Sequence, residues 1–549
     1  MSDNLSYLSG RKGLDDSLFE KLVQSGQVEG TPENSEMKKL AEEYLMGEAI
    51  VYGTASFYDF LKHENAGKKA YVCNGSACLL AGTQDNVHMQ LKTHFAENEI
   101  GEMCCLGRCH ENSAFHIDGK NYSGRAIDEL ATRAKNSRLS KDRYSVKCCA
   151  PLPILTDKFS NIPEFYDGLK QLLLKPADAI LNELKISNLR GRGGAGFPLA
   201  FKLQSCREVD SEQKFIVCNA DEGDPGAYSD RYILEEQPHA LLMGMLIAGY
   251  TVGADTGIVY IRAEYPEAIE IIKKAVGDLQ KHELIGENIL GTGFNYKFKI
   301  IEAAGAYICG EETALLASLE GQRPEVRVRP PYPTQQGLFN KPTVVNNVET
   351  LAAIPWILKN GGQAYANLGT GKSSGTKLVC LDSAFTRPGL YEVEMGMPLR
   401  GLVDEAGGFT KPVKALHVGG PLGGIVPMSK IDDLTIDFES FAENGFLLGH
   451  ASIISIPEDF PMVKYLEHLF AFTAHESCGK CFPCRLGSQR GRELLQKARA
   501  EDYKIDRQLF DDLLETLESG SLCALGGGLP LGIKNALMYF DDELKIFFE

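Results

Sequence analysis

Cysteine is the residue type in this sequence with the clearest chemistry. Two closely spaced pairs, C-x4-C and C-x3-C, comprise Cys73, Cys78, Cys105 and Cys109. Two thiolate pairs in tight loops can converge on one centre, and four thiolates suit either a zinc ion or an iron–sulfur cluster. Spacing leaves both open, because four-cysteine zinc sites use similar pairs. The neighbouring Cys104 lies outside the pattern and is the alternative to Cys105 as a ligand.

A second set of cysteines lies near the C-terminus. The stretch ESCGKCFPC contains Cys478, Cys481 and Cys484 in a C-x2-C-x2-C pattern, and Cys523 follows at a distance. Three ligands on one loop with a distant fourth are typical of a [4Fe-4S] cluster. A four-cysteine zinc site is the alternative.

A glycine-rich loop, NLRGRGGAGFPLAFK at 188–202, precedes most of the other polar motifs. Four glycines occupy six positions, with Arg190 directly before them and Arg192 among them. Such a loop lets backbone N–H groups converge and lets a flat ligand approach the main chain. The guanidinium groups would add charge for a phosphate. A surface loop is the alternative, but three downstream stretches fit the same ligand.

Two of these downstream stretches are acidic. NADEGD (219–224) follows an apolar run, and GAYICGEE (305–312) leads into a predicted helix. Carboxylates in the first stretch suit a ligand site at the end of a strand, and a solvated turn is the alternative. Acids at a helix start can simply complement the helix dipole.

The totals limit the class of protein. A chain of 549 residues is too long for one core and predicts three or four domains. A net charge of −17 argues against nucleic acid and anionic membranes as partners. The longest apolar run, 240–254, is short and contains glycine, and the first residues lack an apolar signal core. We therefore expect a cytoplasmic protein without membrane insertion, whose cysteines bind metal rather than form disulfides.

Hydrophobic patterning predicts an α/β arrangement in the middle of the chain. Buried strands at 214–218 and 257–262 alternate with helices at 237–249 and 266–279, which places a ligand at the carboxyl ends of the strands. The stretch 375–455 is β-rich, and 460–549 is helical. GGPLGG (419–424) is interpreted as a structural turn, because no helix start comes after it.

The sequence resembles a known flavoprotein family. RGRGGAGFP, CNADEGDPGAYSDR, GAYICGEETALLASLEG and KPTVVNNVETLA occur in the order found in proteins that hold FMN, NADH and a four-iron cluster. This family includes the NADH-oxidising subunit of respiratory complex I and the diaphorase subunits of NAD-linked formate dehydrogenases and soluble hydrogenases. The resemblance runs from about Leu169 to the C-terminus. TASFYDF with the first cysteine pattern resembles the thioredoxin-like [2Fe-2S] partner subunit.

The resemblance implies four cofactors or substrates: FMN, NAD(H), a [2Fe-2S] cluster on the first four cysteines and a [4Fe-4S] cluster on the second four. Hydride transfer would be carried by FMN, with no side chain as obligate acid or base. The implied FMN and NAD(H) residues are Gly191, Arg192, Gly193, Gly194, Phe197, Lys202, Asn219, Asp221, Glu222, Asp224, Tyr307, Gly310, Glu311, Glu312, Arg329, Tyr332, Asn346, Asn347 and Thr350.

Some of these positions depart from the family pattern. Asp224 stands where complex I members usually have Glu; an acid near the adenosine ribose repels a 2′-phosphate, which favours NAD over NADP. Arg329 and Tyr332 replace the frequent Lys and Phe. Phe197 matches an aromatic that stacks on the adenine, whereas a second aromatic of some relatives is Ser205 here.

The resemblance also implies a domain plan. Two short helical patterns in the first segment are too small to form a core alone and should pack on later parts of the chain. Cys148 and Cys149 lack a second pair and are interpreted as unbound thiols. The expected parts are a helical N-terminal segment (1–48), a thioredoxin-like ferredoxin domain (49–135), a linker (136–160), a Rossmann-like FMN/NADH domain (161–365), a ubiquitin-like β-grasp domain of SLBB type (366–458) and a helical [4Fe-4S] bundle (459–549).

These parts predict an NADH:acceptor oxidoreductase, or diaphorase, because a flavin connects two-electron hydride chemistry with one-electron clusters. No molybdopterin or nickel site is visible, so the electrons must pass to a partner. GTGKSSGT, GGPLGG, ENGFLLGH and SLCALGG look closest to β subunits of NAD-dependent formate dehydrogenases, whose partner is a molybdopterin α subunit. The alternatives are the diaphorase of an NAD-reducing or electron-bifurcating hydrogenase, a complex I subunit, and a cluster-binding sensor or assembly protein without turnover.

Overall fold

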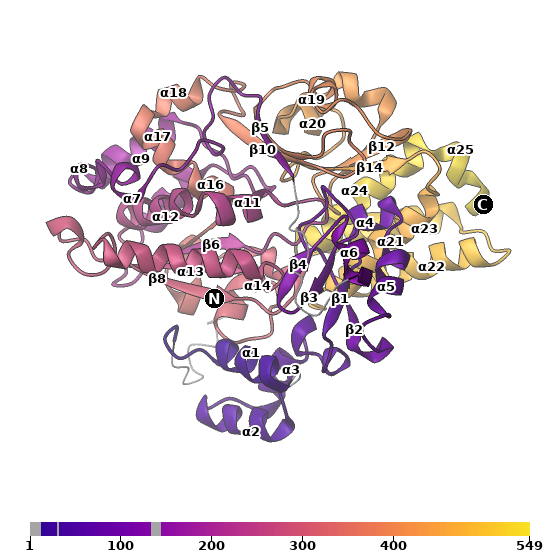
Figure 1. The fold of residues 1–549 in the computed structure, drawn as a ribbon, viewed down its shortest axis with the longest axis horizontal. Helices are drawn as coiled ribbons and strands as arrows, with labels where there is room; N and C mark the ends of the chain where they lie inside the picture. Colours follow the sequence, from indigo (N-terminus) through magenta and orange to yellow (C-terminus); the bar gives the residue numbers. More distant parts are fainter. Residues whose placement is uncertain (1–12, 30–31, 133–143) are drawn as a thin grey trace.

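The computed structural model describes residues 13–29, 32–132 and 144–549, and its helices and strands surround three separate sheets (Figure 1). Within these ranges, no helix has both the length and the apolar character needed to cross a bilayer. The apolar run at 240–254 instead lies mostly in the buried helix α12 (Pro238–Val252).

The N-terminal sheet has the order β2-β1-β3-β4. Its strands and helices are β1 (Ala70–Cys73), α4 (Ser76–Ala81), α5 (Gln84–Leu91), β2 (Ile100–Met103), β3 (Phe115–Ile117), β4 (Lys120–Tyr122) and α6 (Ala126–Thr132). Cys73 ends β1, and Cys105 comes two residues after the end of β2. Because β1 and β2 are parallel, their carboxyl ends lie at the same edge, and this brings the two predicted cysteine pairs together.

The segment before this sheet forms α1 (Leu18–Glu29), α2 (Asn34–Glu43) and α3 (Glu48–Ala55). The prediction that it packs on later parts of the chain is confirmed, and the structure identifies the surface. Helix α1 packs on one face of the central sheet, where Phe19 contacts Tyr260 of the sheet at a ring-centroid distance of 6.4 Å. Phe19 also contacts Tyr58, at 5.1 Å. The contact with Tyr260 joins residues more than two hundred positions apart, so the sequence pattern did not reveal it.

The central sheet is fully parallel in the order β8-β7-β6-β9. Its strands are β6 (Phe215–Ala220), β7 (Thr256–Ile261), β8 (Lys297–Glu302) and β9 (Thr343–Asn347). The predicted alternation of strand and helix is confirmed by β6, α12, β7 and α13 (Pro266–Lys281). The register places Asn219 opposite Asn347, so two of the predicted motifs meet at the carboxyl edge of the sheet.

Helices cover the central sheet on both sides, as expected for parallel strands with apolar faces. The remaining helices of this region are α7 (Ile162–Phe165), α8 (Leu169–Leu173), α9 (Ala177–Ile186), α10 (Leu199–Arg207), α11 (Ser229–Glu236), α14 (Glu312–Leu319), α15 (Pro333–Gln336), α16 (Val348–Ala352), α17 (Ile354–Asn360) and α18 (Gly362–Ala366).

The third sheet is mixed, in the order β13-β12-β14-β10-β11-β5. Its strands and helices are β5 (Ser145–Cys148), β10 (Thr376–Leu381), β11 (Gly389–Glu394), α19 (Leu399–Glu405), β12 (Val413–Val418), β13 (Gly424–Pro427), α20 (Phe438–Glu443) and β14 (Ser452–Pro457). The predicted linker 136–160 therefore contributes an edge strand, β5, parallel to β11. The buried Glu392 carboxylate then accepts the backbone N–H groups of residues 154–156, while residues 133–143 lie outside the described ranges.

The C-terminal part is helical, as predicted. It consists of α21 (Met462–Glu476), α22 (Ser488–Ala500), α23 (Arg507–Gly520), α24 (Ala524–Tyr539) and α25 (Asp541–Leu544) (Figure 1). The cysteine-rich loop lies between α21 and α22, and Cys523 is the residue immediately before α24. The fold therefore returns the distant fourth cysteine toward the other three.

Candidate functional site

A cavity of about 1030 Å³ lies at the carboxyl edge of the central sheet. The glycine-rich loop, the two acidic stretches and the end of β9 all contribute to its wall, so the motifs expected to share one ligand do surround one space. The predicted residues that line it are Gly191, Gly193, Gly194, Phe197, Lys202, Asn219, Asp221, Glu222, Asp224, Tyr307, Gly310, Glu311, Glu312, Arg329, Tyr332, Asn346, Asn347 and Thr350.

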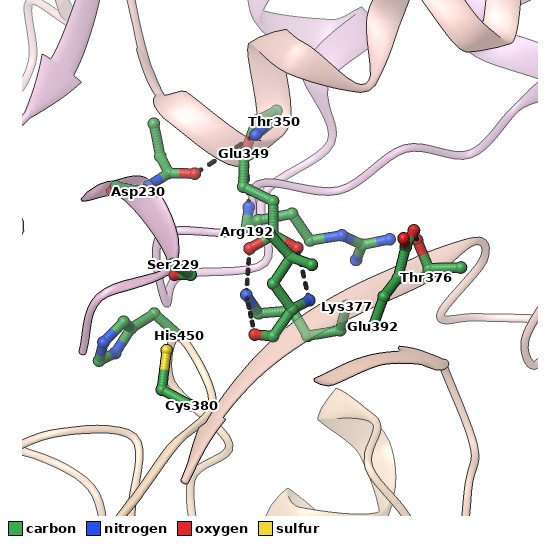
Figure 2. A network of polar contacts seen from close by, with 12 residues as sticks. Arg192, Ser229, Asp230, Glu349, Thr350, Thr376, Lys377, Cys380, Glu392 and His450 are labelled. Atoms are coloured by element: carbon green, nitrogen blue, oxygen red, sulfur yellow. Dashed lines mark hydrogen bonds and ion pairs between the residues drawn. The ribbon is translucent and has the colours of Figure 1, made fainter. Parts of the chain in front are cut away.

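Arg192 is the exception, and the expectation that its guanidinium meets a phosphate is wrong for this structure. The side chain is 1% exposed and donates to the Tyr365 hydroxyl at 3.0 Å and to the Ser374 carbonyl oxygen. In Figure 2 the guanidinium lies on the side of Thr376, opposite Asp230. Only its backbone N–H faces the site, where it donates to Thr350 Oγ1 at 2.8 Å.

Arg190 is likewise engaged away from the cavity. Its guanidinium pairs with Glu439 at 2.6 Å and lies 4.5 Å from the ring centroid of Phe438. Both arginines therefore fasten the glycine-rich loop to the third sheet and its helices. The sequence could not show this, because the acceptors lie about two hundred residues further along the chain.

The main chain of the loop is what borders the cavity. Gly194 has φ of +122°, a region that residues with a Cβ rarely adopt, and Gly193 packs so closely that a Cβ there would lie 2.9 Å from Asn347 Cβ. The backbone consequently stays bare on the cavity side. This supports the expected approach of a flat ligand to the main chain.

The acidic stretch after β6 divides into different roles. Asn219 Nδ2 donates to the Gly310 carbonyl oxygen at 2.7 Å and ties the two acidic loops together. Glu222 is buried and accepts from the Ser229 hydroxyl and from the backbone N–H groups of Asp230 and Arg231, at the start of α11. Its carboxylate thus fixes a helix terminus at the cavity wall rather than forming a solvated turn.

Asp224 belongs to a polar group that the sequence did not reveal. Its carboxylate accepts from the Tyr307 hydroxyl at 2.5 Å and lies 3.1 Å from His450 Nδ1. Gly420 approaches so closely that a Cβ would lie 2.6 Å from Asp224 Cγ, and its φ is +84°. His450 lines the cavity, but it is 226 residues from Asp224 and carries no local motif by which the sequence could have identified it.

The GGPLGG stretch (419–424) also lies at the cavity. The sequence indicates only a structural turn, yet Gly419 and Leu422 line the cavity beside Gly449 and His450. Its glycines turn the chain, as expected, and they also bring the third sheet against Asp224. Position in the tertiary structure, rather than a following helix, places this loop at the site.

In the second acidic stretch, one glutamate caps a helix and the next forms ion pairs. Glu311 accepts the backbone N–H groups of Thr313 and Ala314, each at 2.9 Å, so the helix-dipole alternative describes its local contacts. Glu312 pairs instead with Lys202 at 3.1 Å and with Arg329 at 2.8 Å. These cations leave the Glu312 side of the cavity close to neutral.

Aromatic rings mark the exposed end of the cavity. Phe197 and Phe201 meet edge to face with centroids 5.5 Å apart, and both line the cavity. Phe201 is not among the predicted residues, although its spacing of four residues from Phe197 was a usable signal. Ser205, which stands where some relatives have a second aromatic, forms a hydrogen bond with Thr334 at 3.0 Å, and the ring beside Phe197 is that of Phe201.

The cavity fits a flat polar cofactor such as FMN. The buried polar atoms of its wall that lack hydrogen-bond partners among the described residues include Asn346 Nδ2, Asp221 Oδ2 and Asp230 Oδ1. Burial also raises the pKa of Asp221 well above its usual value. Donors and acceptors of this kind, beside bare glycine backbone, are those that a flavin ring and its ribityl hydroxyls would satisfy.

The N-terminal cysteines form a compact buried group. The Cys73 thiol contacts those of Cys78 and Cys105, and Cys105 Sγ lies 3.4 Å from Cys109 Sγ. Backbone N–H groups of Gly107 and Gly226 point at the sulfurs of Cys105 and Cys109 at 3.4 and 3.3 Å. Four thiols with N–H···S donors fit a thiolate-bound cluster. In this arrangement Cys105, rather than Cys104, contacts the other thiols.

The C-terminal cysteines lie close to residues that line the cavity. Cys478, Cys481, Cys484 and Cys523 pack in one cluster of apolar side chains that also includes Leu525. Leu525 lines the cavity directly after the Cys523 turn. A cluster on these cysteines would therefore be separated from the cavity by one layer of side chains, which suits electron transfer between the two sites.

Four segments of the chain match models of known protein families. Residues 184–356 match the Nuo51 FMN-binding domain, and residues 464–546 match the NADH-ubiquinone oxidoreductase-F iron–sulfur binding region. Residues 15–133 match the thioredoxin-like [2Fe-2S] ferredoxin, and 385–426 match the SLBB domain. The ferredoxin match starts just before α1, so it includes the helices that were predicted to form a separate segment.

Individual relatives support the same family assignment. The NADP-reducing hydrogenase subunit HndC of Solidesulfovibrio fructosivorans is 42% identical over 69% of this chain and 78% of its own length. The F 2 subunit of NADH-quinone oxidoreductase from Rhizobium meliloti is 41% identical over 68% of this chain and 89% of its own. A solved NAD⁺-reducing [NiFe]-hydrogenase, in the H2-reduced state, has a chain with 29% identity and a TM-score of 0.85, covering 97% of this chain and 94% of its own.

The matched regions include the cavity and both cysteine sets, and the matches span well over two thirds of each relative's own length. The chain therefore belongs to the family of NADH-oxidising flavoprotein subunits with FMN-binding and [4Fe-4S] domains, and it carries a thioredoxin-like [2Fe-2S] domain on the same polypeptide.

Proposed function

We propose that this chain is the β, or diaphorase, subunit of an NAD-dependent formate dehydrogenase. In this role it exchanges a hydride with NAD(H) and single electrons with a partner. FMN supplies the chemistry that connects the two-electron and one-electron steps. The observation that carries the diaphorase function is the cavity itself, which joins the nucleotide motifs to the start of α24, directly after Cys523.

In this proposal, different residues of the cavity wall bind different parts of the two ligands. The bare backbone at Gly193 and Gly194 and the amides of Asn219, Asn346 and Asn347 hold the flavin. The opposite end, with Phe197, Phe201 and Tyr332, receives the adenine half of the dinucleotide, and Asp224 faces its ribose. Lys202, Arg329 and the Glu311–Glu312 pair lie between these ends. Arg192 contributes through its backbone N–H and by holding the loop.

The clusters complete the path. We propose Cys73, Cys78, Cys105 and Cys109 as ligands of the [2Fe-2S] cluster, and Cys478, Cys481, Cys484 and Cys523 as ligands of the [4Fe-4S] cluster. The six expected parts, including a β-grasp domain at 366–458 and a C-terminal helical bundle, are proposed with them. The SLBB match inside 366–458 supports the β-grasp assignment, and β5 extends that sheet toward residue 145.

The proposal also names the partner subunit. GTGKSSGT, GGPLGG, ENGFLLGH and SLCALGG favour a molybdopterin α subunit that oxidises formate. Three of these stretches lie at the cavity, since Gly419, His450 and Leu525 line it. A hydrogenase partner is the second candidate, because the solved NAD⁺-reducing [NiFe]-hydrogenase chain aligns with 97% of this one.

Affinity purification from the source cells, with metal analysis, separates these partners. We expect molybdenum in the purified complex and NAD⁺ reduction on addition of formate. The isolated chain with FMN should reduce artificial acceptors with NADH but neither oxidise formate nor evolve hydrogen. Nickel with hydrogen-dependent NAD⁺ reduction would replace the formate partner and leave the diaphorase function intact. Formate oxidation by the isolated chain would contradict both.

A further inference from the structure

The loop that carries Cys105 and Cys109 is held by side chains from outside the ferredoxin domain. Arg262, at the end of β7, is 2% exposed, and its Nη2 donates to the Cys104 carbonyl oxygen at 2.8 Å. The same guanidinium donates through Nη1 to the Glu222 carbonyl oxygen and pairs with Glu264 at 2.8 Å. One buried cation thus connects the cysteine loop with the acidic stretch of the flavin cavity.

Two further groups reach the same loop from α11 and the segment before it. Arg231, also 2% exposed, donates to the Gly107 carbonyl oxygen at 2.8 Å and pairs with Glu235 at 2.9 Å. The Gly226 N–H points at Cys109 Sγ at 3.3 Å. Three independent contacts, separated by 117 to 158 residues in sequence, therefore converge on one loop.

We propose that the buried Arg262–Glu264 pair positions the [2Fe-2S] loop and sets the reduction potential of its cluster. The central domain would then supply an essential part of the environment of a cluster whose cysteines all come from the ferredoxin domain. The inference rests on the proposed ligand set of Cys73, Cys78, Cys105 and Cys109, and it is independent of the partner's identity.

Charged groups close to the cluster affect its reduction potential. Reduction adds one electron to the cluster and breaks no bond, so the reduced form carries one more negative charge. A nearby buried guanidinium favours that form, and a nearby carboxylate disfavours it, because charges interact strongly where water is excluded. Arg262 and Glu264 therefore act with opposite signs, while the contact to Cys104 fixes how close the guanidinium lies to the loop.

The test is a redox titration of the full chain monitored by electron paramagnetic resonance of the [2Fe-2S] signal. Arg262→Gln should lower the midpoint potential, and Glu264→Gln should raise it. At a fixed solution potential near the wild-type midpoint, we expect the ratio of reduced to oxidised cluster to change about tenfold in each direction, which is ~59 mV for one electron. A general loss of packing would not shift the midpoint potential in opposite directions in the two variants.

Two further variants sharpen the result. Arg262→Lys keeps the charge and loses the two-carbonyl fork, so its shift should be smaller than that of Arg262→Gln. Arg400→Gln removes an exposed arginine that pairs with Asp432, and it should leave the potential unchanged. If Arg262→Gln fails to assemble a cluster, Glu264→Gln alone decides.

An unchanged potential in Glu264→Gln, or shifts of the same sign in both Gln variants, would overturn the inference. These outcomes leave the proposed ligand set and the diaphorase function in place. A wild-type chain without a [2Fe-2S] signal would instead overturn the ligand set, and with it this inference.

Discussion

At the scale of single residues, the nucleotide end of the cavity depends on a few charged side chains. Asp224 is held by Tyr307 and faces His450, so its carboxylate is fixed rather than free to swing. In the proposed placement, where Asp224 faces the ribose, a fixed carboxylate would repel the 2′-phosphate of NADPH. The HndC relative is described as NADP-reducing, which makes this position a useful one to test.

Asp224→Asn should weaken discrimination against NADPH by about 1–2 kcal/mol, because a repelling charge is removed while the shape is kept. The measurement is the ratio of kcat/KM for NADPH and NADH with an artificial acceptor. Asp224→Glu, which restores the acid usual in complex I members, is the control and should retain the preference for NADH. If the ratio is the same in Asp224→Asn and wild type, Asp224 does not determine specificity.

At the scale of elements, the third sheet is fastened to the cavity through buried charge. Lys377 on β10 and Glu349 on α16 form an ion pair whose side chains are 0% and 1% exposed, and Figure 2 shows the contact beside Arg192 and Thr350. Glu349 also accepts the Leu378 N–H at 3.0 Å. The pair therefore joins a strand of one domain to the helix that comes directly after the asparagine motif.

Lys377→Met should lower the free energy of unfolding by about 3–5 kcal/mol, because it leaves the Glu349 carboxylate buried without its cation. Thermal and denaturant unfolding followed by flavin fluorescence measure the loss. Combining it with Glu349→Leu should recover part of the stability, since neither charge is then unpaired. A single variant as stable as wild type would show that water or a rearranged side chain compensates the charge.

At the scale of the whole molecule, the N-terminal helices and the ferredoxin domain are built into the central domain. Phe19 is fully buried between Tyr58 and Tyr260, the latter on β7, and Arg262 at the end of the same strand reaches the cysteine loop. Contacts of this extent predict that these parts unfold together.

Phe19→Ala should destabilise the central domain as well as the N-terminal helices, by about 3–5 kcal/mol, because it opens a cavity against β7. The measurement is a thermal melt that follows FMN release by fluorescence and helix content by circular dichroism. Both transitions should shift to lower temperature together. The exposed Tyr52 on α3 offers a matched control, since Tyr52→Ala should change little. An FMN-release temperature equal to wild type would mean that the helices unfold independently.

The sequence alone determined the parts that depend on local pattern. Strands β6 and β7, helices α12 and α13, the cysteine spacings and the ordered family motifs depend on residues close together in the chain, and all but one of the predicted FMN and NAD(H) residues line a single cavity. The FMN, [4Fe-4S] and [2Fe-2S] domains were identifiable for the same reason, because thiolate spacing and glycine-rich loops are short-range signals.

Only the tertiary structure decided where long-range partners meet. It turned Arg192 away from the cavity, brought His450 and GGPLGG to Asp224, and paired β5 with β11. It also placed Arg262 on the cysteine loop, 158 residues away in sequence. The physical reason is that a buried polar group such as the Arg192 or Arg262 guanidinium must find a partner, and which partner it finds depends on how the sheets pack and not on its sequence neighbours.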